Sequence, residues 1–131
     1  MYHWLSSSLS NYVDIYFTGV ITSPNYPRDY PNNLQKTETI RTKKGMVIEI
    51  EFTTFKLYSS SDWLTIRDGN ESILMDTKNG NGNALPPKIW SFTNVVQFEF
   101  VTNSYDTSTG WRATWTAVTP AGSTEDDTFL I

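Results

Sequence analysis

The 131-residue sequence contains no cysteine and one histidine, His3. Without cysteine the chain forms no disulfide, no thiolate metal site and no cysteine nucleophile. The sequence also lacks the G-x-S-x-G and H-E-x-x-H motifs, so that no nucleophile has an identifiable base beside it. We therefore predict that this chain is not an enzyme.

Basic charge and long apolar runs are scarce as well. Ten lysines and arginines stand against 14 aspartates and glutamates, giving a net charge of −4. No basic stripe is available to neutralise phosphates, which argues against a nucleic-acid partner. No apolar run approaches the roughly 18 residues of a membrane helix, so we expect no membrane insertion. The 38% apolar and 15% aromatic content indicates a folded body.

Helical spacing is absent too, and alternating strands take its place. In "MVIEIEF", residues 46–52, apolar side chains alternate with glutamates at the period of a half-buried strand. The segments "DWLTIRDG", "NVVQFEFV" and "GWRATWTA" alternate similarly, and weaker strands are expected at "QKTETIR", "SILM" and "KIWSF". Turn residues separate these segments. The pattern predicts an all-β protein, an antiparallel β-sandwich.

The two ends of the chain differ from this body. We expect residues 1–16 to form a flank, either an extra strand or a docking segment, and residues 17–118 to form the sandwich domain. Residues 119–131, "TPAGSTEDDTFLI", combine turn formers and acids with a short apolar stretch, a composition typical of an acidic linker or docking tail.

One short motif points outside the cell. "NES", beginning at Asn70, is an N-glycosylation sequon beside the turn expected at "RDGN". Such a triplet also arises by chance, and the prediction that Asn70 is glycosylated depends on the sequon alone.

The order of motifs resembles the CUB domain family of extracellular β-sandwich modules. "GVITSPNYPRDYPNN" is similar to the opening signature of that family, and "GMVIEIEFTTFKL" to its central strands. "DWLTIRDG" and "FEFVTNSYDTSTGWRATWTA" resemble its next strand and its closing strand pair. The resemblance covers roughly residues 17 to 118 and implies a jelly-roll-like sandwich in an extracellular or cell-surface protein.

The sequence departs from the family at its cysteines. Members commonly carry four, whereas Lys36, Ser59 and Asn79 stand at matching positions here, and Glu38 replaces a common tryptophan. Each missing disulfide removes about 2–4 kcal/mol of stabilisation. Burial of apolar side chains must therefore hold this domain together.

The resemblance also implies a calcium site at one end of the sandwich. Asp62, Asn103 and Asp106 match the family's ligand positions, and Tyr30 matches a tyrosine that supports the site. Tyr58, also near the site, falls where the family has its first acidic ligand. Two carboxylates therefore remain where three are usual, and a lower charge weakens calcium binding. The alternative is that Asp62 caps a turn while Asn103 and Asp106 make local hydrogen bonds.

The function implied by the resemblance is a noncatalytic protein–protein interaction module that receives a lysine or arginine of its partner, either with or without calcium. Five tryptophans keep a carbohydrate-binding module open as an alternative, with Trp63 and Trp90 as candidate sugar platforms. We expect Trp111 and Trp115 to lie in the core. A third alternative is a structural or adhesive spacer in a larger extracellular assembly.

Overall fold

The computed structural model describes residues 5–7, 14–16, 18–58, 61–78 and 83–120, in which every regular element is a strand. Within these residues no helix is long and apolar enough to cross a membrane. The strands are β1 (Leu5–Ser7), β2 (Asp14–Tyr16), β3 (Thr18–Thr22), β4 (Gln35–Arg41), β5 (Val47–Lys56), β6 (Trp63–Asp68), β7 (Ile73–Asp76), β8 (Ile89–Trp90), β9 (Val95–Val101) and β10 (Gly110–Val118).

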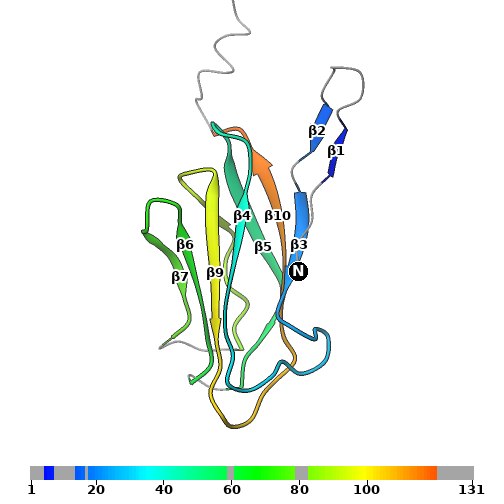
Figure 1. The fold of residues 1–131 in the computed structure, drawn as a ribbon, viewed down its shortest axis with the longest axis vertical. Helices are drawn as coiled ribbons and strands as arrows, with labels where there is room; N and C mark the ends of the chain where they lie inside the picture. Colours follow the sequence, from blue (N-terminus) through cyan, green and yellow to red (C-terminus); the bar gives the residue numbers. More distant parts are fainter. Residues whose placement is uncertain (1–4, 8–13, 17, 59–60, 79–82, 121–131) are drawn as a thin grey trace, which may run out of the picture.

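The strands form two four-stranded sheets, ordered β3-β10-β5-β8 and β4-β9-β6-β7, and a separate pair, β1-β2. Every pairing within the sheets is antiparallel. The two sheets face each other as the layers of a sandwich (Figure 1). The prediction of an antiparallel β-sandwich is confirmed.

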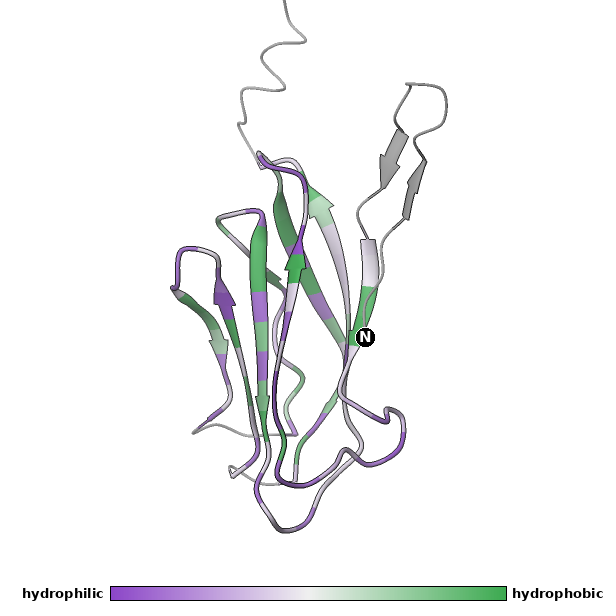
Figure 2. Cartoon of the chain, in the orientation of Figure 1, coloured by the Kyte–Doolittle hydropathy of each residue, from purple (hydrophilic) through white to green (hydrophobic). Residues whose placement is uncertain are grey.

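Alternation along the strands determines which side chains form the core. Figure 2 shows hydrophobic and hydrophilic bands alternating along β9, whose residues Val96, Phe98 and Phe100 are buried. Trp111 and Trp115 of β10 are also buried, as predicted. Each large apolar side chain contributes about 1.5–3 kcal/mol on burial, which stabilises a domain without disulfides. Thr65 is an exception to the alternation: it is buried although it shares a face with Trp63.

The observed strand boundaries agree only in part with those predicted from the sequence. β4 has the predicted bounds, whereas β5 continues four residues beyond the predicted "MVIEIEF" segment. β3 was not predicted, because "TGVIT" contains glycine and threonines and little apolar contrast. It forms as an edge strand through its pairing with β10.

The proline-rich segment after β3 is fixed to the last strand. The Ser23 amide donates a hydrogen bond to the Trp111 carbonyl at 3.0 Å, and the Trp111 amide donates to Ser23 Oγ at 3.0 Å. Gly110 has φ +89°, and a Cβ there would lie 1.9 Å from Ser23 Oγ. Glycine at this position therefore permits both the backbone conformation and the close contact.

Candidate functional site

Three loops meet at one end of the sandwich, at the bottom of Figure 1, which we call the loop end. They connect β3 to β4, β5 to β6, and β9 to β10. The loop end is defined by the five residues that the sequence places at the calcium site: Tyr30, Tyr58, Asp62, Asn103 and Asp106. Antiparallel pairing brings these residues to the same end because β6 begins there and β9 ends there.

Tyr30 is the buried centre of this end. Its side chain is 1% exposed, and its ring contacts Phe100 edge-on with 5.0 Å between centroids. The hydroxyl donates to Asp62 Oδ2 at 2.7 Å and accepts a hydrogen bond from the Tyr58 amide at 3.0 Å. Burial, reinforced by the hydrogen bond to Asp62, raises the pKa of the Tyr30 hydroxyl well above its usual value. The hydroxyl therefore stays protonated and keeps its donor role.

Asp62 connects Tyr30 to the β9–β10 loop. Its carboxylate is 1% exposed, and Oδ1 accepts a hydrogen bond from the Asn103 amide at 2.8 Å. The Asn103 carbonyl accepts a hydrogen bond from the Asn33 amide at 2.8 Å, and the Asn103 side-chain oxygen accepts one from the Tyr105 amide at 3.1 Å. The three loops are thus joined by hydrogen bonds between protein atoms.

Asp106 and Tyr58 lie at an open pocket at the same end. A hydrogen bond to Asp106 raises the pKa of the Tyr58 hydroxyl. The pocket has a volume of about 580 Å³. None of its described lining residues is basic; they are Asp29, Asn32, Tyr58, Ser104, Tyr105, Asp106 and Thr107. Two carboxylates without a basic neighbour in the lining make this pocket suited to a cation.

The predicted calcium ligands do not form one charged cluster. Asp62 is buried and is absent from the pocket lining, whereas Asp106 lines the pocket. Tyr58 provides a phenol where the family has its first acidic ligand, as expected from the sequence. In the described part of the chain, no three His, Cys, Asp or Glu side chains lie close enough to hold a metal ion. Asp62 and Asp106 therefore supply two carboxylates at the loop end, a lower charge than is usual in the family, and calcium binding stays a prediction.

Asn70 lies away from the loop end, in the turn after β6. It is exposed, and its side-chain oxygen accepts hydrogen bonds from the Ser72 amide at 2.9 Å and hydroxyl at 2.6 Å. Its glycosylation stays a prediction. Ser59 and Asn79, two of the positions matching cysteines, lie outside the described residues.

Sequence reasoning missed two aspartates. Asp29 lines the pocket, and its position beside Tyr30 in "SPNYPRDYP" was the available signal. Asp68 was assigned only to a turn, yet it is 2% exposed and accepts hydrogen bonds from Gly69, Phe92 and Thr93. Nothing in the strand pattern distinguishes its buried carboxylate from an exposed turn residue.

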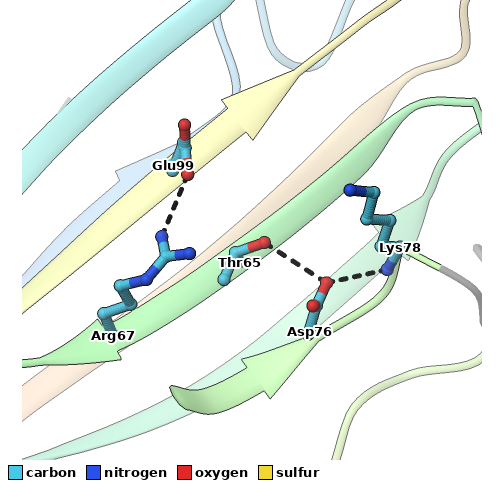
Figure 3. A network of polar contacts seen from close by, with 5 residues as sticks. All are labelled: Thr65, Arg67, Asp76, Lys78 and Glu99. Carbon is cyan, nitrogen blue, oxygen red and sulfur yellow. Dashed lines mark hydrogen bonds and ion pairs between the residues drawn. The ribbon is translucent and has the colours of Figure 1, made fainter. Parts of the chain in front are cut away.

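The two candidate sugar platforms, Trp63 and Trp90, do not form a shared surface: a lysine lies over the Trp63 ring, and Trp90 is in the other sheet. Lys78 Nζ lies 4.8 Å from the centroid of the Trp63 ring, next to the polar network of Thr65, Arg67, Asp76 and Glu99 that Figure 3 shows. The Arg67–Glu99 ion pair spans 3.0 Å across β6 and β9. Trp90 is 52% exposed but belongs to the other sheet. No feature of the described residues favours the carbohydrate alternative.

Comparisons with known proteins agree with this architecture. The family model for the CUB domain matches residues 13–115. Human cubilin is 35% identical over 117 residues, covering 84% of this chain and 3% of cubilin. The astacin-like metalloendopeptidase of Gallus gallus is 33% identical over 118 residues, covering 85% of this chain and 28% of that protein. The chain thus spans a small fraction of these relatives.

One solved structure adds a fold comparison. The MASP-1 CUB2 domain, crystallised bound to Ca²⁺, has a TM-score of 0.67 and 24% identity, with 75% of this chain and 90% of that chain covered. At that identity the match shows the fold. The calcium ion is a property of the MASP-1 domain.

Proposed function

Because the chain belongs to the CUB domain family, whose matched relatives are extracellular or cell-surface proteins, we propose that it is a noncatalytic module that binds a partner protein through the loop end. The partner places a lysine or arginine side chain in the pocket. The observation that carries this proposal is the pairing of Asp29 and Asp106 in a lining without basic residues.

The chemistry of the lining suits a long cationic side chain. Asp29 and Asp106 supply carboxylates for charge-assisted hydrogen bonds to an ammonium or guanidinium group. Tyr58 and Tyr105 are 55% and 72% exposed, so that their rings are available to the alkyl stem of the incoming side chain and to cation–π contact. An exposed charge pair contributes only about 0.2–1 kcal/mol, so the rest of the affinity comes from the surrounding surface.

We also propose that this binding does not require calcium. The Tyr30–Asp62 and Asp62–Asn103 hydrogen bonds, at 2.7 and 2.8 Å, already connect the loops that line the pocket. Tyr58 stands at the position of the family's first acidic ligand, and its phenol forms a hydrogen bond with Asp106. Protein hydrogen bonds thereby do the positioning for which the family resemblance implied a metal ion.

The test is a titration of the ¹⁵N-labelled chain, in the presence of EDTA, with a capped Gly-Lys-Gly peptide. A single surface contact binds weakly, so millimolar peptide is needed, corresponding to about −4 kcal/mol. We expect amide shifts at Tyr58, Tyr105 and Asp106. The same peptide with acetylated lysine should produce none of these shifts, because acetylation removes the charge.

Two variants complete this test. Asp106→Asn should abolish most of the shift, whereas Glu71→Gln, an exposed acid in the β6–β7 turn, should leave it unchanged. Equal binding of the acetylated peptide, or undiminished binding by Asp106→Asn, would overturn the proposal. A shift that appears only after calcium is added would contradict its calcium-independent part.

A further inference from the structure

A second open surface lies at the opposite end of the sandwich, where β5 begins and β10 ends (Figure 1). The pocket on this surface has a volume of about 500 Å³ and is mainly apolar. We call the surface formed by its lining residues the exit face; they are Val47, Trp90, Ser91, Phe92, Val118, Thr119 and Pro120. Trp90 is 52% exposed and Phe92 is 74% exposed. Two large apolar side chains left this open on one surface are typical of a docking site.

Basic side chains border the exit face. The Thr42 amide donates to the Asn94 carbonyl at 2.9 Å, and Asn94 Nδ2 donates to the Thr42 carbonyl at 2.8 Å. These bonds hold the β4–β5 turn against the loop that carries Phe92. Arg41, Lys43 and Lys44 of this turn region are exposed, and none forms an ion pair within the described part of the chain.

The chain itself continues from this surface with complementary residues. Pro120 is both a lining residue of the exit face and the last described residue before the segment 121–131. That segment carries Glu125, Asp126 and Asp127 followed by the apolar residues 129–131. Nine extended residues span up to about 30 Å, enough for Phe129 to return to the face across the Gly122 region.

We propose that residues 125–131 of this chain dock in cis on the exit face. Phe129 and Leu130 occupy the apolar pocket beside Trp90 and Phe92, where their burial removes apolar surface from water. The preceding acids face the basic side chains of the β4–β5 turn, which gives the contact its orientation. This contact is independent of the pocket at the loop end, since the two surfaces lie at opposite ends of the strands.

Because the sequence contains no cysteine, one introduced cysteine provides a single site for a thiol-reactive label. In the Thr128→Cys variant, a nitroxide spin label is attached to this cysteine. Docking predicts loss of NMR signal from the amides of Trp90 and Phe92, and no loss from those of Asp62 and Asn103 at the loop end. Reduction of the nitroxide should restore the lost signals.

Matched variants separate docking from mere proximity. Phe129→Ser with Leu130→Ser should reduce the signal loss at Trp90 and Phe92 to that of a free tether of about eight residues, whose ends lie about 14–17 Å apart. Lys44→Glu should weaken the signal loss, whereas Lys56→Glu, an exposed lysine at the far end of β5, should not. Undiminished signal loss in the double serine variant would overturn the proposal, as would the absence of any loss in the labelled chain.

A mixing experiment distinguishes the cis contact from pairing between two chains. Spin-labelled chain without ¹⁵N is mixed with ¹⁵N-labelled chain without the spin label. Unchanged signals in the mixture support docking in cis. Signal loss at Trp90 and Phe92 in the mixture would assign the contact to a second copy and overturn the cis proposal.

Discussion

Strand β6 has a buried aspartate at each end, and the two carboxylates make different use of their oxygens. Asp62 immediately precedes the strand and is 1% exposed, while Asp68 is its last residue and is 2% exposed. Asp62 accepts two hydrogen bonds, from the Tyr30 hydroxyl and the Asn103 amide. Asp68 accepts four, from the amides of Gly69, Phe92 and Thr93 and from the Thr93 hydroxyl.

The two aspartates differ in the number of hydrogen bonds that their carboxylates accept. Asp68 has a structural role, whereas Asp62 keeps more oxygen lone pairs without a hydrogen bond. An ionised carboxylate has about four lone-pair sites. Three of the hydrogen bonds to Asp68 converge on Oδ1 and one reaches Oδ2, and together they fix the β8–β9 loop, which carries the exposed Phe92. Asp62 uses about half of its sites and lies beneath the loops that line an open pocket. Burial alone therefore does not indicate which of the two carboxylates keeps more unused acceptor capacity.

The largest effect is expected from Asp68→Ala. The substitution leaves the Phe92 and Thr93 amides, which donate to Asp68 at 2.7 and 3.2 Å, without their acceptor. It also removes the bonds from the Gly69 amide and the Thr93 hydroxyl, although both of these keep the Val95 carbonyl as an acceptor. Unsatisfied donors cost about 1–3 kcal/mol each, so we expect a loss of roughly 4–5 kcal/mol in the free energy of unfolding. Urea denaturation followed by tryptophan fluorescence measures it.

Asp62→Ala should cost less, roughly 3 kcal/mol by the same measurement, because two hydrogen bonds to a charged acceptor are lost instead of four. Asp68→Asn and Asp62→Asn serve as controls of nearly equal size that keep one acceptor oxygen, and each should fall between its alanine variant and the unsubstituted chain. If Asp62→Ala proved as costly as Asp68→Ala, counting hydrogen bonds would not explain the difference between these residues.

The sequence predicted the sandwich better than it predicted the chemistry at its ends. Period-two alternation located β5, β6, β9 and β10, because burial of one face imposes that period. The motif around Asp62 directed attention to the loop end, and the structure brings Asp62, Asn103 and Tyr30 together there. The four hydrogen bonds to Asp68 come mostly from residues far along the chain, so no local pattern announces them.

The apolar exit face was equally hidden from sequence reasoning. The sequence predicts an outward-facing Trp90, but it places Phe92 in the predicted strand "KIWSF", of which only Ile89–Trp90 pairs. The hydrogen bonds between Asp68 and the Phe92 and Thr93 amides end that strand early. A contact made between distant loops therefore decided which aromatic side chain is exposed.

Tyr30→Phe should have a smaller effect, roughly 2 kcal/mol at neutral pH, because the ring remains and only the hydroxyl with its bonds to Asp62 and the Tyr58 amide is lost. Folding raises the pKa of Tyr30 above its ordinary value of 10.0. The protonated hydroxyl therefore stabilises the fold fully below about pH 10, and this contribution is lost as the pH rises further.

The unfolding free energies of both chains, measured between pH 7 and pH 11, check this sign. The gap between the unsubstituted chain and Tyr30→Phe should be constant up to about pH 9 and narrow above pH 10. Taking the difference removes the titration of the other tyrosines and the lysines, which both chains share. A gap that widens with rising pH would contradict the assigned hydrogen bond between Tyr30 and Asp62.

The smallest effect is expected from Tyr58→Glu, which sharpens the distinction between Asp62 and Asp68. Position 58 is 55% exposed, so in EDTA the substitution should change the unfolding free energy by less than about 0.5 kcal/mol. The new carboxylate adds a third acidic group to Asp62 and Asp106 at the loop end, which is the charge usual for calcium sites of the family, and a higher ligand charge strengthens calcium binding. Calcium at ten times its dissociation constant then stabilises this variant by about 1.4 kcal/mol. Thermal unfolding with and without calcium measures the gain, with Tyr58→Gln as the uncharged control.

An equal calcium response in the unsubstituted chain would show that Asp62 and Asp106 are sufficient to bind calcium. That result would refute the proposal that hydrogen bonds replace a metal ion at the loop end.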